Sequence, residues 1–225
     1  MQYLSERLLA TKTGRPRGEE QGRPAVAEQQ RDRILTATEH LIARNGYSGT
    51  TIEGIAKQAR VSAVTFYDHF AGKEEAFVAA FERAVEEARA LLADEAPAAL
   101  PWPEQVRAGL GALLTTVSEN PARARMCLVE SMRDGRALLA AYEAVLDSAA
   151  AKLREGRRLD SAAGDLPGVL EETTAAGVAW LLRERLETAG AERVEEMLPG
   201  LIEIVLGPYL GSAEALRLAV AEEGG

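Results

Sequence analysis

The sequence of 225 residues has few of the side chains from which enzyme and metal sites are built. It holds one cysteine and two histidines, which excludes an intrachain disulfide and a multi-cysteine zinc site. It has no glycine-rich phosphate loop and no cluster with metal-ligand spacing, so we expect neither an enzyme nor a cofactor. The longest segment without a charged residue, 108–118, is too short to span a membrane, and we expect no membrane partner.

Aromatic residues are also scarce, at 5%, whereas alanine occurs 41 times. Alanine is the best helix former, and strands prefer β-branched and aromatic residues. No segment alternates polar and apolar residues over the length of a strand. The sequence therefore predicts an all-α fold. Because the N-terminus lacks the pattern of a signal peptide, we expect a cytoplasmic protein.

The net charge of −9 is unevenly distributed. Residues 1–75 carry 11 basic and 10 acidic side chains, a net charge of +1, and residues 76–225 carry a net charge of −10. An acidic surface repels phosphate groups, so a nucleic acid can only be approached by the first third of the chain.

Glycine, proline and charge patterns divide the chain into a flexible basic arm (1–27), a small helical domain (28–75) and a larger helical region (76–225). We call the second part the head and the third part the body. Capping signals at Thr50, Ser62 and Gly46 delimit the helices of the head, and a further helix begins near Lys73. In the body we expect helices near 103–119, 121–132, 136–158, 167–188 and 191–210.

Two short helices joined by "ARVS" form a helix-turn-helix, whose second helix enters the major groove of DNA. We expect Val61, Val64 and Phe70 to face the core. The outward positions are expected to be Ser62, Ala63, Thr65, Tyr67 and Asp68.

The segments "RILTATEHLIARNGYSGTTIEGIA", "VSAVTFYDHF" and "GKEEAF" resemble the DNA-binding domain of the TetR family of transcriptional regulators. The resemblance implies that Thr51 contacts the DNA backbone, that His69 and Lys73 contact phosphates, and that four residues face the groove: Ser62, Ala63, Thr65 and Tyr67. Arg60 replaces the usual turn glycine. It must therefore tolerate a left-handed or otherwise restricted conformation at a cost of about 1 kcal/mol, and it adds a cation near the backbone. The alternatives are that Tyr67 belongs to the core and that His69 is an ordinary surface or capping residue.

The arm contains two Gly-Arg-Pro triplets, which resemble the core of an AT-hook. The resemblance implies that Arg15 and Arg23 lie in a narrow minor groove, where the negative potential is enhanced. The alternatives are a tail without a role in DNA binding and a mis-assigned translation start.

In the body the resemblance implies a homodimer formed by the last two long helices, and a pocket for a small-molecule effector. For the dimer interface we expect Thr174, Gly177, Val178, Leu181, Leu201, Ile204 and Val205. For the ligand pocket we expect Trp102, Leu110, Leu113, Leu114, Val117, Met126, Met132, Tyr142 and Trp180. Plain core packing is the alternative for both sets.

The function implied is that of a nucleoid-associated repressor, released from a pseudo-palindromic operator in double-stranded DNA by a small, largely apolar ligand. The ligand would shift the helix that begins near Lys73 and so change the separation of the two heads. The alternative is a helical ligand-binding or interaction protein with degenerate DNA binding.

Overall fold

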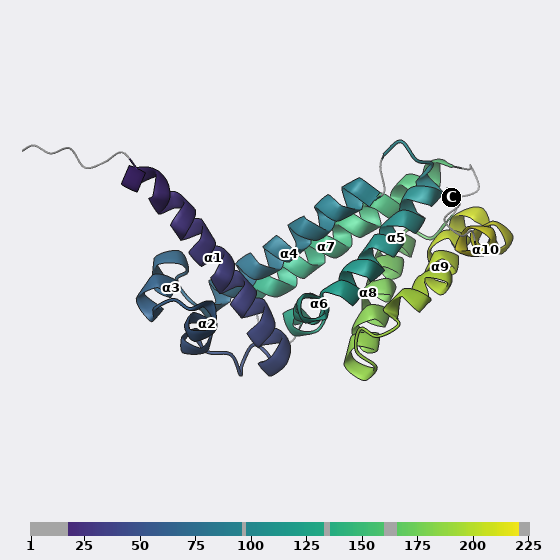
Figure 1. Cartoon of the computed structure of the whole chain (residues 1–225). Helices are drawn as coiled ribbons and strands as arrows, with labels where there is room; N and C mark the ends of the chain where they lie inside the picture. The colour runs from purple at the N-terminus through teal and green to yellow at the C-terminus, as the bar shows by residue number, and fades with distance from the viewer. Residues whose placement is uncertain (1–17, 96–97, 133–135, 160–165, 221–225) are drawn as a thin grey trace, which may run out of the picture.

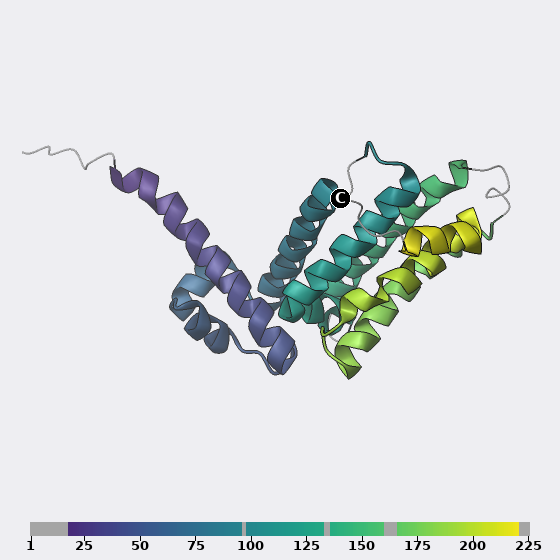
Figure 2. The same cartoon turned by 45° about the vertical axis from the view of Figure 1, so that its right-hand side comes forward.

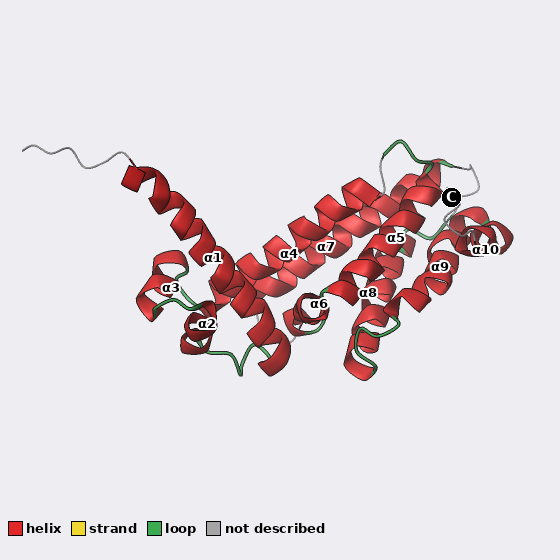
Figure 3. Ribbon diagram, viewed as in Figure 1, coloured by secondary structure: helices red, strands yellow, loops and turns green. Residues whose placement is uncertain are grey.

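The computed structural model describes residues 18–95, 98–132, 136–159 and 166–220, and the regular elements in these ranges are all helices (Figure 3). The all-α prediction is confirmed. No helix in the described part of the chain is long and apolar enough to cross a membrane.

The head consists of α1 (Gly18–Asn45), α2 (Ile52–Ala59) and α3 (Ala63–His69). In Figure 1 the N-terminal end of α1 projects away from the body, and α2 and α3 lie along one side of α1. The predicted arm is wrong for residues 18–27, which are helical. The helix runs without interruption through Pro24 and Ala25 into the helix predicted from residue 28. Arg15 lies outside the described residues.

The body follows from α4 (Lys73–Glu95), which connects it to the head (Figure 2). Its other helices are α5 (Trp102–Glu119), α6 (Pro121–Leu128), α7 (Arg136–Arg154), α8 (Leu170–Thr188), α9 (Leu198–Leu210) and α10 (Ser212–Val220). The helices predicted near 121–132, 136–158 and 191–210 each include a 3-10 turn: η1 (Glu130–Met132), η2 (Glu155–Arg158) and η4 (Val194–Met197). The sequence did not predict α10, which follows Gly211 at φ +79° and packs across α9.

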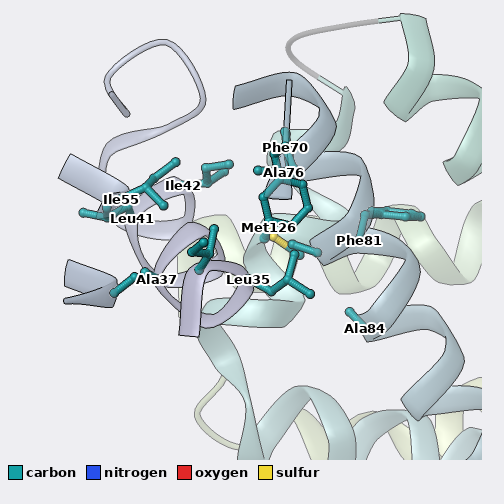
Figure 4. Close-up of a cluster of buried hydrophobic side chains, with 14 of the residues drawn as sticks. Leu35, Ala37, Leu41, Ile42, Ile55, Phe70, Ala76, Phe81, Ala84 and Met126 are labelled. Carbon is teal, nitrogen blue, oxygen red and sulfur yellow. The ribbon is translucent and has the colours of Figure 1, made fainter. Parts of the chain in front are cut away.

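Three clusters of buried apolar side chains hold these helices together. The head cluster includes Ile34, Phe66 and Phe70 of the head, and it also takes in Phe81 of α4 and Met126 of α6 from the body. Figure 4 shows Phe70, Phe81 and Met126 in this cluster. A second cluster joins α5 to α9 and α10 around Trp102 and Tyr209, whose ring centroids are 5.0 Å apart. A third cluster joins α5, α8 and α9 around Leu114, Leu182 and Leu201.

Candidate functional site

The helix-turn-helix begins at Thr51, whose Oγ1 accepts a hydrogen bond from the backbone N–H of Gly54 at 3.1 Å. The predicted cap, Thr50, is therefore one residue too early. Its hydroxyl instead donates to the carbonyl of Gly46 at 2.8 Å, and its side chain is buried. At the other end of α2, Arg60 adopts the left-handed conformation with φ 57° and ψ 45°, as predicted.

The first turn of α3 is fixed by Ser62, which is the N-cap residue as predicted. Its Oγ accepts a hydrogen bond from the backbone N–H of Thr65 at 2.9 Å and lies 2.9 Å from the hydroxyl of Thr65. This cap sets the rotation of the short helix, so that Ser62, Ala63, Tyr67 and Asp68 are exposed and Thr65 is half-buried. The exposure of Tyr67 excludes the alternative that it belongs to the core.

The predicted core position of Val64 is wrong, because its side chain is 71% exposed. Phe66 is the buried residue instead, four positions before Phe70 on the same face of α3. Positions 64 and 70 are six residues apart, which separates them by about 120° around a helix, so their side chains point to different faces of α3. The outward face of α3 therefore carries an apolar side chain that sequence reasoning missed. The six-residue spacing between Val64 and Phe70 is the sequence signal that could have revealed the exposure of Val64.

The cations near α3 have different roles. Arg60, Lys57 and Arg31 are exposed, and the guanidinium of Arg31 lies 4.6 Å from the ring centroid of Phe70. His69 is half-buried, with Nε2 3.4 Å from Oε1 of Gln30, and remains a candidate for phosphate contact.

Lys73 instead stabilises the head from within. Its ammonium donates to the carbonyls of Tyr47 and Thr50 at 2.7 and 2.8 Å and lies 4.1 Å from the ring centroid of Tyr47. Two of its three N–H donors are thus used inside the head.

The structure divides the buried residues among those predicted for the pocket between three clusters. Met126 and Tyr142 belong to the head cluster, Trp102 to the second cluster, and Leu114 and Val117 to the third. Leu110 packs against the second and third clusters, and Leu113 packs against the third.

Two further pocket predictions are wrong, because Met132 and Trp180 are 46% and 61% exposed. The inward face of α8 is formed by Ala175, Ala179, Leu182 and Leu186, which leaves Trp180 on the outer face. A shallow hollow of about 200 Å³ between α7 and α8 is lined by other residues: Glu143, Leu146, Asp147, Glu172 and Ala176. Within the described part of the chain, no group of His, Cys, Asp and Glu could hold a metal ion.

The predicted dimer residues fall into two groups. Gly177 and Ile204 are exposed on α8 and α9, and three others are half-buried: Thr174, Val178 and Leu181. Leu201 and Val205 are each 2% exposed inside the protomer, so their prediction as interface residues is wrong. They lie on the face of α9 that packs against the rest of the body, whereas Ile204 points away from it.

A buried carboxylate lies between the helices of the body. Glu171 accepts hydrogen bonds from Arg157 Nε at 2.7 Å, Arg157 Nη2 at 3.0 Å and the Tyr209 hydroxyl at 2.9 Å. The bonds from Arg157 lower the pKa of Glu171 most, and a backbone hydrogen bond and the Tyr209 hydroxyl lower it further, so the pKa lies below its usual value in spite of burial. Burial and the nearby Glu171 raise the pKa of Tyr209. Burial raises the pKa of the Cys127 thiol to about 12, which favours the thiol over the thiolate at neutral pH.

Comparison with known proteins identifies the head. Residues 34–80 match the family described as "Bacterial regulatory proteins, tetR family". An uncharacterized HTH-type transcriptional regulator of Lactococcus lactis subsp. lactis is 40% identical over 55 residues, which cover 24% of this chain and 28% of that relative.

Solved structures share the fold over most of the chain at low sequence identity. The fatty acid degradation regulator FadR from Bacillus halodurans superposes with a TM-score of 0.70 at 15% identity, over 80% of this chain and 94% of that chain. FadR from Bacillus subtilis, solved in complex with stearoyl-CoA, gives a TM-score of 0.65 at 17% identity over 80% and 97% of the two chains.

A TetR family transcription regulator from Marinobacter aquaeolei gives a TM-score of 0.62 at 20% identity, over 87% of this chain and 97% of that chain. The family match covers the head, and the solved structures show that the fold extends over the body as well. Residues 34–80 thus have the sequence of the DNA-binding head of the tetR family of bacterial regulatory proteins, and the chain shares the fold of solved regulators of this family.

Proposed function

We propose that the protein is a repressor that binds a pseudo-palindromic operator as a homodimer and is released from it by a small, largely apolar ligand. The observation that carries the proposal is the outward face of α3. It presents Ser62, Ala63, Val64 and Tyr67 to solvent, while Phe66 and Phe70 fix the helix to the head cluster. Short polar and apolar groups at the start of such a helix are suited to reading base edges in the major groove.

Val64 refines this proposal, because an exposed apolar side chain in the first turn of α3 is suited to contact the methyl group of a thymine. The test replaces each thymine of the operator in turn by deoxyuridine, which lacks only that methyl group. At one position per half-site, the replacement should weaken binding by the wild type but not by Val64→Ala. Equal losses for both proteins at every position would exclude the contact.

The phosphate contacts are assigned to Thr51, Arg60 and His69, with Arg31 and Lys57 added by their exposure. Lys73 is not among the proposed phosphate contacts, because its ammonium already donates to the carbonyls of Tyr47 and Thr50.

The minor-groove contact is narrowed to one arginine. Arg23 lies within α1, so the extended AT-hook conformation does not apply to it. A minor-groove contact is proposed only for Arg15. Deletion of residues 1–17 should then reduce the preference for A·T-flanked operators, and an unchanged preference would exclude the contact.

For the dimer we propose the outer faces of α8 and α9, with Gly177, Trp180 and Ile204 as its exposed residues. A bulky apolar side chain beside a glycine allows two helices to approach closely, and two heads one helical turn apart would match a palindrome. Trp180→Glu should give monomers in sedimentation velocity and abolish operator binding. Met132→Glu, at a 46% exposed position on η1 and so outside α8 and α9, is the control and should remain dimeric.

For the ligand we propose a molecule with a long acyl chain. This is supported by the shared fold with the Bacillus subtilis FadR that binds stearoyl-CoA. The assay is release of a labelled operator by stearoyl-CoA, with coenzyme A and free stearate as separate arms. Release by stearoyl-CoA alone would support an acyl-CoA effector, and release by none of the three would exclude this class.

The experiment that tests the regulator itself is selection of bound genomic fragments. A pseudo-palindromic motif is expected, bound with an affinity that falls steeply as salt is raised, because phosphate contacts release counterions. Failure to bind any duplex at low salt would favour the alternative, a helical ligand-binding protein with degenerate DNA binding.

A further inference from the structure

The short helix α6 reaches from the body into the head. Arg123 and Met126 are three residues apart on α6 and so lie on the same face of this helix. Met126 is fully buried in the head cluster, where Figure 4 shows it alongside Leu35 of α1. Arg123 is mostly buried at the edge of this contact. A helix of the body is therefore fixed to the head by an apolar and a charged side chain.

The charged contact is a closed ring of four side chains from three helices. Arg123 of α6 donates from Nε to Oε2 of Glu39 on α1 at 3.3 Å and from Nη1 to Oε2 of Glu87 on α4. Arg83 of α4 donates from Nη2 to Oε1 of Glu39 at 2.6 Å, and its Nε lies 3.8 Å from Oε1 of Glu87. Positive and negative groups alternate around the ring, and its net charge is zero.

Burial makes this ring sensitive to geometry. The side chain of Glu39 is 5% exposed, and each of its two oxygens has its own arginine. A buried carboxylate is tolerated only while it is paired and hydrogen-bonded. If α6 slides along α1, Oε2 of Glu39 loses its partner while it is still shielded from water. The ring therefore favours one position of α6 relative to α1.

The two arginines hold different parts of the molecule together. Arg83 also donates to the carbonyl of Asp32 at 3.3 Å and to Oγ1 of Thr36 at 3.2 Å, so α1 and α4 stay joined without Arg123. Arg123 pairs with Glu39 on α1 of the head and with Glu87 on α4, the helix that connects head and body, whereas its own helix α6 follows α5 within the body. Loss of Arg123 would thus separate α6 from the ring and leave the head intact.

We propose that this ring is the link through which the body sets the orientation of the head, and that Arg123 is its positioning residue on the body side. One residue, Asn120, separates α5 from α6, and α5 packs in the second and third clusters of the body. A displacement of α5 therefore carries Arg123 and Met126 with it and pulls on α1 directly. This route supplements a shift of α4. It rests on the proposed function, in which the state of the body controls the head.

The test measures the head-to-body distance within one protomer by pulsed electron spin resonance. Spin labels are placed at Gln58→Cys on α2 and Ser148→Cys on α7, both exposed, in a Cys127→Ala background. An excess of unlabelled protein removes distances between protomers. Arg123→Met should broaden the distance distribution beyond the spread of the labels. Arg125→Met is the matched control, because Arg125 lies on the same helix but points to the carbonyl of Leu186 on α8, and it should leave the distribution unchanged.

The same variants are titrated with the selected operator. Arg123→Met should weaken operator binding about tenfold, within the usual range of coupling between sites, while Arg125→Met should not. Arg123→Lys should be intermediate in both measurements, because one ammonium lacks the fork that spans two carboxylates. An unchanged distance distribution in folded Arg123→Met would overturn the proposal. If this variant does not fold, a wild-type distribution for Arg123→Lys would overturn it.

The distance is measured without DNA or ligand, so it is independent of the proposed function. A chain that binds no operator would refute the regulator and leave the link standing. A rigid head in Arg123→Met would refute the link and leave the regulator standing.

Discussion

Met126 provides a direct test of the packing between head and body. Its side chain has no exposed surface and lies in the head cluster, although it comes from α6. Met126→Ala removes three heavy atoms from this cluster and leaves a cavity between two parts of the molecule. Buried Met→Ala changes cost about 2–5 kcal/mol, and we expect about 3 kcal/mol here. For a domain of this size that corresponds to a fall in melting temperature of about 6–12 °C.

The assay is thermal and urea unfolding followed by far-UV circular dichroism. Met132→Ala is the matched control, because Met132 lies six residues further along the chain and is 46% exposed. It should change the unfolding free energy by no more than about 0.5 kcal/mol. Equal effects of the two substitutions would refute the assignment of Met126 to the head core and of Met132 to the surface.

Three further predictions follow from backbone geometry and electrostatics. Arg60 has a left-handed backbone, so Arg60→Gly should raise the free energy of unfolding in urea by about 0.5–1 kcal/mol. The same substitution should weaken operator binding, because it removes a cation. Gly46 has φ +72°, so Gly46→Ala should lower the free energy of unfolding. Gly156→Ala should lower the free energy of unfolding by about 1–3 kcal/mol, because the added Cβ would lie 2.5 Å from the ring of Trp102. Gly168→Ala is the control, because its added Cβ would meet nothing within 4 Å. The lowered pKa of Glu171 contributes stability above the ordinary glutamate pKa, which is lost as the pH falls through the lower folded value. The stability difference between the wild type and Glu171→Gln should therefore shrink in acid; a difference independent of pH would refute the hydrogen-bonded carboxylate.

The sequence predicted the helix-turn-helix well because its signals are local. The Ser62 cap and the left-handed turn at Arg60 each depend on a few neighbouring residues, and both are confirmed. Local patterns failed where a short helix offers too few apolar positions to fix its rotation. Because α3 has only seven residues, the sequence pattern placed Val64 in the core and did not identify Phe66, which is the buried residue.

The sites of the body depend on contacts distant in sequence and were predicted less well. Apolar residues at helical spacing show that a helix has a buried face, but they do not show which partner covers it. Met126 and Trp180 illustrate the two errors, because one packs into the head and the other lies on the outer surface. The ring around Glu39 was not predicted, because its members lie up to 84 residues apart in the chain.

The measurement that tests the central claim most directly is the affinity of α3 variants for the selected operator, by fluorescence anisotropy at a fixed salt concentration. Thr65→Ala and Tyr67→Ala should each weaken binding to the operator by about 10–100-fold and change non-specific binding little, because they remove contacts to bases. Thr115→Ala, an exposed threonine of α5 in the body, is the control and should bind as the wild type does. Unchanged operator affinity for both α3 variants would contradict the account that α3 reads the DNA.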